Sequence, residues 1–288
     1  NTLVVCPYAP VVYVQNRLAN FCEIPDPGTP EVVIGDVPHG SVTRELFYSE
    51  ALHRWMRCFV YLPPDYCAGK KYPVLYLQHG NTGNETGWLY EGKVANLMDH
   101  LLAEKRCVPF LIVMNNGMVR YPNETEGKNE FFAFTDLLLR DCIPYIDSRF
   151  STKPEKWSRA MAGLSMGSTQ TAHLVFTHPE LFGSAGLFSG CMRGLATDDR
   201  YEDYGYLAVT RDAKRFEQEY RLFFRALGSE DPTWENFLRD DRYLGRQGIT
   251  ALPCHHRAVY DGQAHSWGAW RRAFCDFASL LFRGEGCC

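Results

Sequence analysis

A serine stands at the centre of the segment with the clearest chemical pattern in the chain. Gly163, Ser165 and Gly167 form a G-x-S-x-G motif, with small apolar residues before it and a helix-compatible run at 168–176 after it. This context is typical of a nucleophile elbow, because the turn from strand to helix is so sharp that only glycine fits two residues to either side of the serine. The hydroxyl of Ser165 would then be exposed at a helix N-terminus, where free N–H groups favour developing negative charge. The alternative is a glycine-rich surface turn, and partners elsewhere in the chain must decide between the two interpretations.

A serine nucleophile needs a base that takes its proton and a third group that orients the base. His265 lies in a glycine-containing loop directly after the last expected strand, and Asp231 lies directly after the strand before it. Reactive groups gather beyond the carboxyl ends of the strands in a doubly wound sheet, so both residues can meet Ser165. A solvated turn acid before Pro232 is the other interpretation of Asp231. The other candidates for the acid are Glu230, Asp240, Asp241 and Asp261.

A glycine-rich loop follows the buried strand expected at 72–78 and can turn a backbone N–H toward the site. We expect the oxyanion of a tetrahedral intermediate to be held by the N–H of Met166 and by a second N–H from this loop, that of Asn81. Losing one such donor typically raises the barrier by about 3 to 4 kcal/mol. His79, at the start of the loop, is interpreted as a structural residue that anchors it rather than as a catalytic one. The candidates for substrate contact are Trp88, Gln170 and His79, with tyrosines of the 191–220 segment.

The order of expected elements positions these residues. Strand-like and helical segments alternate from residue 72 onwards, which predicts βαβ units and a mainly parallel, doubly wound α/β sheet with helices on both faces. The three strand-like segments before residue 64 are expected as antiparallel strands at one edge of that sheet. The expected strands are 31–34, 40–48, 55–62, 72–78, 108–114, 184–189, 220–227 and 254–260, with one more before Ser165, and the expected helices are 92–106, 130–147, 168–176 and one that starts at Ser266 as its N-cap.

Two segments fall outside this alternation. Residues 1–30 are irregular and rich in proline, so we expect 1–35 to be an N-terminal extension and 36–288 to be a single catalytic domain. Residues 191–220 are polar and aromatic; a cap over the site and a solvated insertion are both open.

Composition excludes several classes of partner. The chain has 288 residues, of which 45% are hydrophobic and 14% aromatic, which is ample for the core of one large domain. Its net charge of −4 comes from dispersed residues of both signs, so no basic stripe for nucleic acid and no polybasic membrane patch is visible. The longest apolar runs, such as 108–114, are far shorter than the roughly 20 residues that a membrane span needs. We therefore expect a soluble protein without a nucleic acid or membrane partner.

The cysteines and histidines suggest no disulfide framework and no metal. Eleven scattered cysteines in a chain of this size favour reduced thiols, and hence a cytoplasmic location. The chain begins at Asn1, which leaves secretion open. No Cys-x-x-Cys pair or His-Glu-x-x-His helix occurs, and the adjacent His255 and His256 would point to opposite faces of a strand, so both are interpreted as structural. We expect neither a metal nor a cofactor.

With these residues in place, the chain resembles the esterase D-like branch of the α/β-hydrolases, and most of all the feruloyl and acetylxylan esterases of carbohydrate esterase family 1. The resemblance extends from Asp36 to Phe282 and rests on several separate motifs in the right order. These motifs are VPHG at 37–40, VYLPPDY at 60–66, LYLQHG at 75–80 followed by Glu85 and Trp88, DCIPYID at 141–147, AGLSMG at 162–167, and HSW at 265–267 followed by Trp270.

The resemblance implies the roles of nucleophile for Ser165, acid for Asp231 and base for His265, which also follow the chain order of an α/β-hydrolase triad. It likewise implies an oxyanion hole at Met166 and Asn81. The chain departs from the family pattern directly after Met-Gly, because these enzymes usually have a glycine where 168–170 reads Ser-Thr-Gln. That departure could reshape the floor of the acyl pocket.

The reaction implied by the resemblance is hydrolysis of an ester that links a hydroxycinnamic or acetyl group to a sugar or small polyol. The expected partner is therefore a small-molecule or oligosaccharide ester, with a homodimer left open. An S-formylglutathione hydrolase, a siderophore esterase or an acyltransferase would share the fold. From a different class, a binding module without turnover is the remaining alternative.

Overall fold

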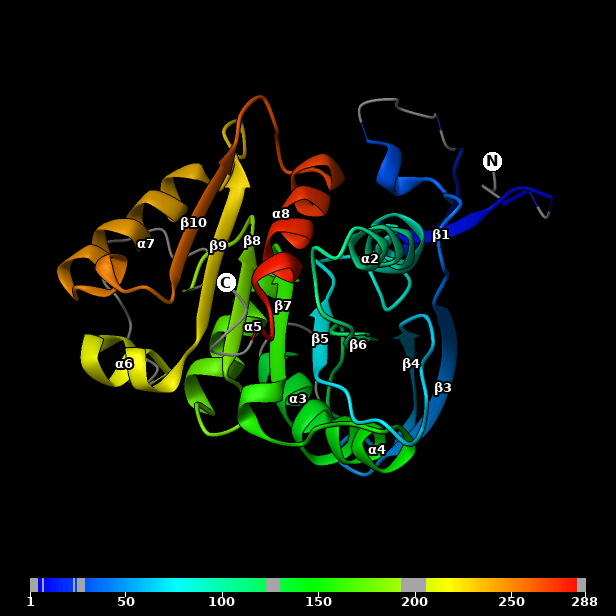
Figure 1. The fold of residues 1–288 in the computed structure, drawn as a ribbon, viewed down its shortest axis with the longest axis horizontal. Coiled ribbons are helices and arrows are strands. Elements are labelled where there is room, and N and C mark those ends of the chain that lie inside the picture. The colour runs from blue at the N-terminus through cyan, green and yellow to red at the C-terminus, as the bar shows by residue number, and fades with distance from the viewer. Residues whose placement is uncertain are drawn as a thin grey trace.

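The central element of a computed structural model of the chain is an eight-stranded sheet. The structure describes residues 5–6, 8–22, 24, 29–122, 130–192 and 206–283. The strands lie in the order β10-β9-β8-β7-β5-β6-β4-β3, and neighbours from β10 to β6 are parallel, whereas β4 is antiparallel to both β6 and β3. The doubly wound, mainly parallel sheet with antiparallel edge strands is thus confirmed (Figure 1). The strands are β3 (Ser41–Ser49), β4 (Arg54–Leu62), β5 (Val74–Gln78), β6 (Leu111–Asn115), β7 (Arg159–Leu164), β8 (Ser184–Phe188), β9 (Leu222–Gly228) and β10 (His255–Tyr260).

Helices cover both faces of the sheet, and its inner strands are therefore buried on both sides. Every residue of β5, β6, β7, β8 and β9 is buried, as expected for parallel strands between two helical layers. The hydrophobic side chains form two clusters, one on each face. One face carries α1 (Gly87–Tyr90), α2 (Val94–Ala103) and α8 (Trp267–Leu280), and the other carries α3 (Glu130–Asp136), α4 (Ile143–Arg149), α5 (Met166–Thr177) and α6 (Ala213–Glu219).

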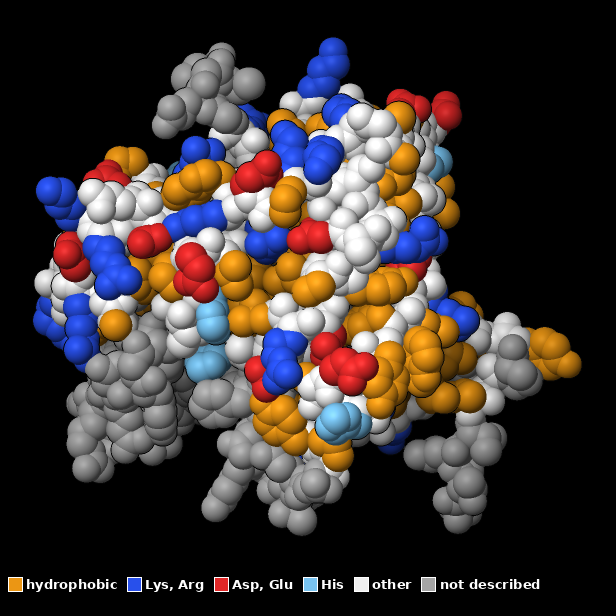
Figure 2. All heavy atoms as spheres, turned by 90° about the horizontal axis from the view of Figure 1, so that it is seen from below, with side chains coloured by type: hydrophobic (Ala, Val, Ile, Leu, Met, Phe, Trp, Pro, Cys, Tyr) orange, Lys and Arg blue, Asp and Glu red, His pale blue; other side chains and the backbone are white. Residues whose placement is uncertain are grey.

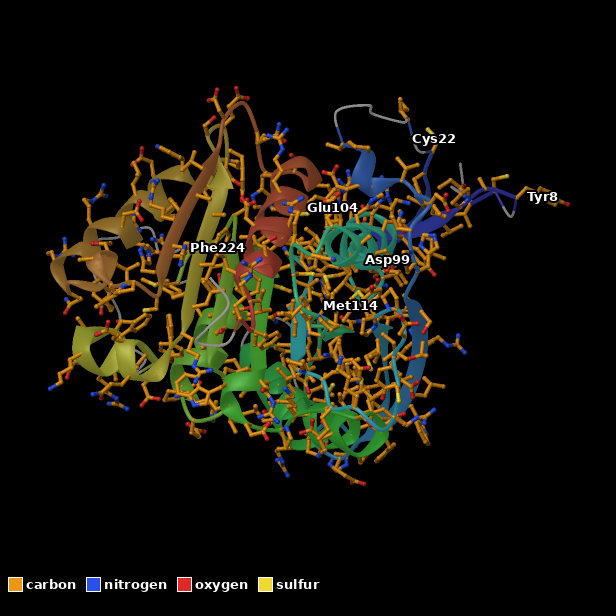
Figure 3. All side chains as sticks on the ribbon, viewed as in Figure 1. Tyr8, Cys22, Asp99, Glu104, Met114 and Phe224 are labelled. Atoms are coloured by element: carbon orange, nitrogen blue, oxygen red, sulfur yellow. The ribbon has the colours of Figure 1, made fainter. Side chains whose placement is uncertain are left out.

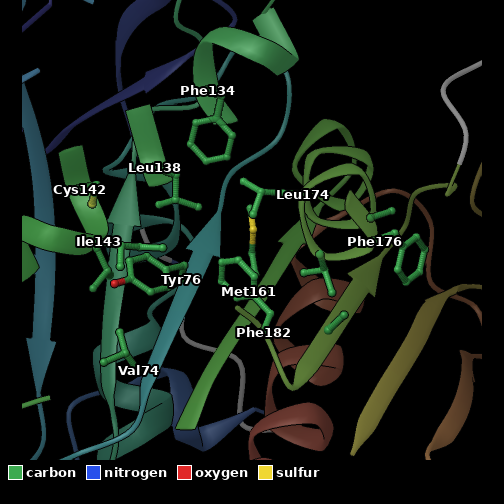
Figure 4. Packing of buried hydrophobic residues seen from close by; sticks show 14 of the residues in the cluster. Val74, Tyr76, Phe134, Leu138, Cys142, Ile143, Met161, Leu174, Phe176 and Phe182 are labelled. Atoms are coloured by element: carbon green, nitrogen blue, oxygen red, sulfur yellow. The ribbon is translucent and has the colours of Figure 1, made fainter. Parts of the chain in front are cut away.

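The cluster beneath α3, α4 and α5 shows how this packing works. Tyr76 of β5 and Met161 of β7 are 1% and 0% exposed, and Phe134 and Leu174 pack over them from the helices (Figure 4). A π-helical turn, Leu137–Cys142, joins α3 to α4, so 130–149 is one helical run, as expected for 130–147. Pro144 lies just after that turn and has no N–H to donate into it, which accounts for the locally widened helix.

The N-terminal segment differs from expectation. Instead of irregular chain, it contains an antiparallel hairpin, β1 (Val11–Val14) and β2 (Arg17–Asn20). Instead of a strand at 31–34, it contains a 3₁₀ turn at Pro30–Val32, where the fixed backbone angle of Pro30 favours a turn start. This segment projects from one end of the molecule, and Tyr8 at its edge is 97% exposed (Figures 1 and 3).

Two further helical segments follow β8. The sequence analysis did not identify α7 (Trp234–Arg246), an amphipathic helix that buries Phe237, Tyr243 and Leu244. The described part of the 191–220 segment contains a 3₁₀ stretch, Tyr206–Arg211, and α6. Residues 193–205, with Tyr201 and Tyr204, lie outside the described residues, so the role of a cap stays a prediction.

Charged side chains of both signs are interspersed on the face seen from below (Figure 2). Among the helices of the described ranges, none combines the length and the apolar character that crossing a bilayer requires.

Candidate active site

Ser165 lies on a strained turn between β7 and α5. Its φ of 53° and ψ of −119° are unusual for a residue with a side chain, and such strain is common at functional sites. Both flanking glycines are required, because a Cβ on Gly163 would lie 2.5 Å from the carbonyl of Gly167, and a Cβ on Gly167 would lie 2.4 Å from the oxygen of His79. The Ser165 N–H donates to the oxygen of Phe188 at 2.9 Å, which ties the turn to β8. The local structure is therefore that of a nucleophile elbow.

His265 and Asp231 form a hydrogen-bonded pair. His265 Nδ1 lies 3.0 Å from Oδ2 and 3.2 Å from Oδ1 of Asp231. The carboxylate is fully buried, whereas the imidazole is 28% exposed, so the ring presents its other nitrogen at the surface of the site. Ser165 Oγ makes no hydrogen bond to any described group, whereas His265 and Asp231 are already paired. Catalytic hydrogen bonds often tighten only when substrate is bound.

The carboxylate of Asp231 is held in its charged form. Burial alone would raise its pKa, but hydrogen bonds from His265 and Thr233 outweigh burial and lower the pKa to about 2. Thr233 contributes both its N–H, at 2.8 Å from Oδ1, and its hydroxyl, at 2.7 Å. A carboxylate that is ionised at neutral pH can orient His265 and stabilise the imidazolium that forms when the base takes a proton.

Backbone contact brings the loops after β9 and β10 together. A Cβ on Gly228 would lie 1.9 Å from the oxygen of Gln263, and that oxygen accepts a hydrogen bond from the Glu230 N–H at 2.9 Å. The other candidates for the acid are occupied elsewhere or exposed. Glu230 is exposed, Asp240 accepts from the Met192 N–H, Asp241 pairs with Arg225 and Arg257, and Asp261 accepts from Ser229.

Two backbone N–H groups are available beside Ser165. Met166 begins α5, and neither its N–H nor that of Asn81 donates to any group in the described part of the chain. The loop that carries Asn81 passes close to the nucleophile, since a Cβ on Gly80 would lie 3.2 Å from the Cβ of Ser165. Both features are what an oxyanion hole requires, and the assignment to Met166 and Asn81 stays a prediction.

The three residues expected to touch substrate, His79, Trp88 and Gln170, are all buried, and their contact with substrate stays a prediction. His79 and Gln170 hold Gly117 from two sides: His79 Nε2 accepts its N–H at 2.9 Å, and Gln170 Nε2 donates to its oxygen at 3.0 Å. His79 Nδ1 lies 2.7 Å from the oxygen of Gly80, and burial lowers the His79 pKa to about 4, against the opposing effect of hydrogen bonds with Gly80 and Asn116. Neutral His79 is thus a loop anchor, as expected, and its contact with substrate stays untested, like that of Gln170.

Trp88 belongs to an aromatic cluster behind the base. It is 1% exposed, and its indole N–H donates to the oxygen of Gln78 at 2.9 Å. Its ring lies 5.2 Å from that of Trp267, which lies 5.1 Å from Trp270, and the Trp270 ring packs edge-on against His265 at 5.0 Å. The cluster therefore buttresses His265. Sequence analysis identified Trp270 only as part of the family resemblance, although its place five residues after His265 was a signal for this contact.

The departure at Ser168 and Thr169 is absorbed by packing. Thr169 Oγ1 donates to the oxygen of Cys191 at 3.1 Å, and a Cβ on Gly190 would lie 2.4 Å from Ser168 Oγ. Both hydroxyls thus face Gly190 and Cys191 in the loop after β8, and this loop packs against the turn that carries Ser165.

No group of His, Cys, Asp and Glu within the described ranges could hold a metal ion. Burial lowers the pKa of His255 to about 4, with its ring 5.6 Å from that of Phe223, and the nine cysteines that the structure describes are all free.

A mainly parallel eight-stranded sheet whose second strand runs antiparallel, with Ser, Asp and His beyond the carboxyl ends of β7, β9 and β10, defines an α/β-hydrolase. The family model described as putative esterase matches residues 49–279, and the chain belongs to this family.

One relative with a described activity is similar over most of the chain. An endo-1,4-beta-xylanase/feruloyl esterase of Xylanibacter ruminicola is 34% identical over 254 residues, which cover 86% of this chain and 32% of that protein. This chain thus spans about a third of that relative's length. Two solved structures share the fold: a ferulic acid esterase from Anaeromyces mucronatus in complex with ferulic acid (TM-score 0.71, 19% identity, 86% and 92% of the two chains), and a feruloyl esterase module from Clostridium thermocellum complexed with sinapinate (TM-score 0.70, 21% identity, 95% and 96%).

Proposed function

We propose that the protein is a serine carboxylesterase that hydrolyses feruloyl-type esters of sugars or small polyols. The observation that carries this proposal is the hydrogen-bonded pair of His265 and buried, ionised Asp231, which lies beyond the same sheet edge as the strained Ser165. The feruloyl esterase activity of the relative, and the ferulic acid and sinapinate bound in the two similar structures, support the choice of a hydroxycinnamic acyl group.

The mechanism uses this chain's own residues throughout. Ser165 Oγ attacks the ester carbonyl while His265 takes its proton, and the negative charge on the carbonyl oxygen is stabilised by the N–H groups of Met166 and Asn81. The tetrahedral intermediate collapses, His265 returns the proton to the departing sugar hydroxyl, and a feruloyl group remains on Ser165. Water then attacks this ester with His265 as base, which releases ferulate and restores the serine. No step requires a cofactor.

We further propose, as expected from the sequence, that residues 36–288 form the catalytic domain and that residues 191–220 contribute to the acyl pocket. The described end of that segment is attached to α7, since Thr210 Oγ1 lies 2.8 Å from the hydroxyl of Tyr243.

A matched panel of esters tests the function. Methyl ferulate, chlorogenate, acetylated xylo-oligosaccharide and p-nitrophenyl acetate are offered to wild type and to Ser165→Ala. Turnover that depends on Ser165 and is fastest on the hydroxycinnamates is the expected result. Preference for acetyl esters would assign a deacetylase, transfer to an added alcohol in place of hydrolysis would assign an acyltransferase, and S-formylglutathione and a siderophore lactone complete the panel. No Ser165-dependent turnover, together with no labelling of Ser165 by a fluorophosphonate, would assign a binding module.

A further inference from the structure

The N-terminal hairpin, which carries no chemistry of its own, reaches the loop that supplies the oxyanion donor. Its two turn residues, Gln15 and Asn16, have φ values of 52° and 58°, as in the tight two-residue turns that connect twisted strands. The N–H of Asn16 donates to the oxygen of Thr82 at 3.3 Å. The hairpin is attached to the domain through β1, which packs against α1 and buries Val12 to 5% exposure. The turn is therefore hydrogen-bonded to the residue that directly follows Asn81 in the chain.

Thr82 occupies a conformation that needs support. Its φ of 63° lies in the left-handed region, which a threonine rarely adopts unless its surroundings hold it there. Three hydrogen bonds hold this turn: Gly83 N–H to the oxygen of Gly80 at 3.2 Å, Thr82 N–H to Asn81 Oδ1 at 3.0 Å, and the bond from Asn16. The first two are internal to the loop, and the third connects it to a different part of the chain. The Asn81 N–H is thus oriented by a strained turn to which the hairpin is bonded.

We propose that the β1–β2 hairpin is a positioning element of the active site, which keeps the Asn81 N–H directed at the oxyanion through the bond from Asn16 to Thr82. This inference rests on the proposed function, in which Asn81 is an oxyanion donor. An oxyanion donor acts on charge that exists only in the transition state, so a misdirected donor slows the reaction and leaves ground-state binding unchanged. Asn16 is accordingly a positioning residue, and the hairpin affects kcat rather than KM.

The test changes the backbone preference of the turn. In the double variant Gln15→Val/Asn16→Val, β-branched side chains disfavour the left-handed conformation of both turn residues, whereas Gln15→Gly/Asn16→Gly accepts it and keeps both N–H groups. Hydrogen exchange over 11–20 reports whether the turn has loosened, and the thermal midpoint reports the global fold. Kinetic readouts are kcat and KM for methyl ferulate and the rate at which a fluorophosphonate labels Ser165, a reaction that places negative charge in the same oxyanion hole.

The expected result is a loss of about tenfold in both kcat and labelling rate for the valine variant, which is less than the 10²- to 10³-fold cost of removing a donor outright. KM should stay within about twofold of wild type, and the glycine variant should match wild type in every readout. A loosened hairpin with unchanged kcat and labelling, or a change confined to KM, would overturn the inference. If wild type hydrolyses none of the esters, the proposed function fails by itself, and the labelling rates still decide whether the hairpin positions the oxyanion hole.

Discussion

Replacing Asp231 with asparagine should disable the base and leave the fold intact. In wild type, Oδ1 of Asp231 accepts both hydrogen bonds of Thr233, and Oδ2 faces Nδ1 of His265 at 3.0 Å. The amide of asparagine will keep its oxygen toward Thr233, because both Thr233 groups are donors, and will therefore turn its NH₂ toward His265. Nδ1 must then accept, which moves the ring proton to Nε2. Nε2 can no longer take the proton of Ser165.

The size of the effect follows from this change of tautomer. The same substitution in a serine protease triad lowers kcat by about 10⁴, equivalent to about 5.5 kcal/mol in the barrier. We expect a loss of 10³- to 10⁴-fold here (about 4 to 5.5 kcal/mol) because the carboxylate is fully buried and water cannot take its place. The measurement is kcat for methyl ferulate at pH 7, calculated from the concentration of folded protein.

Neighbouring substitutions provide the controls. Thr233→Val removes one hydrogen bond to Asp231 and keeps the backbone one, so kcat should fall by less than about tenfold. Glu230→Gln and Asp261→Asn remove rival acids and should leave kcat within about twofold of wild type. An Asp231→Asn variant that retained a tenth of the wild-type kcat would refute the tautomer argument, and a large loss in Glu230→Gln would move the acid to that position.

Three further predictions concern stability and support of the site. The pKa of Asp231 is lowered to about 2 in the folded protein from an ordinary value of 3.8. The ionised carboxylate therefore stabilises the fold fully above about pH 4, and this stabilisation disappears as the pH falls toward 2. In urea unfolding, the stability of wild type should fall by about 2 kcal/mol more than that of Asp231→Asn over this range. Gly163→Ala should lose at least about 3 kcal/mol in urea unfolding, because its Cβ meets the Gly167 backbone at 2.5 Å, whereas Gly245→Ala, with its nearest neighbour at 3.9 Å, should be neutral or stabilising. His79→Phe leaves the buried Gly117 N–H without its acceptor and should cost about 1 to 3 kcal/mol. Because burial lowers the His79 pKa to about 4 from an ordinary value of 6.5, the unfolded chain takes up a proton at this residue near pH 6 and the folded protein does not. Wild type therefore loses about 0.8 kcal/mol between pH 8 and pH 6 that the variant does not lose, so the cost of His79→Phe should be smaller at pH 6, and a cost that grew toward pH 6 would contradict a neutral anchor.

The elements that carry Ser165, Asp231 and His265 could be predicted from the sequence because their signals are local. The glycines around Ser165 mark a turn that few other residues can make, and His265 and Asp231 follow strands with clear hydrophobic patterns. Position at a strand end then placed them on one edge of the sheet. The burial of Trp88 and Gln170 could not be predicted in this way, because a residue's type does not say whether it faces a pocket or the core.

The hairpin and α7 were missed for a different reason. The strands of the hairpin are four residues each, and β1 is stabilised by contact with α1 and by burial of Val12, which no local pattern reveals. The helix α7 is mostly polar along its length, and only a few of its residues, such as Phe237, Tyr243 and Leu244, are buried in the core. Proline at residue 30 outweighed the strand preference of Val32 and Val33.

Backbone contacts between loops, more than side-chain contacts, set the geometry of this site. Gly167 lies against the oxygen of His79, Gly190 lies against the oxygen of Ser165, and Gly228 lies against Gln263, so each catalytic loop touches another through main-chain atoms. Main-chain positions do not depend on which side chains line the acyl pocket. Substitutions in that pocket can therefore change the acyl group that is accepted and leave the nucleophile, base and oxyanion donors in place. By the same argument, variants at these glycines should lose activity on every ester in the panel to the same extent, whereas pocket variants should change the ranking of the esters.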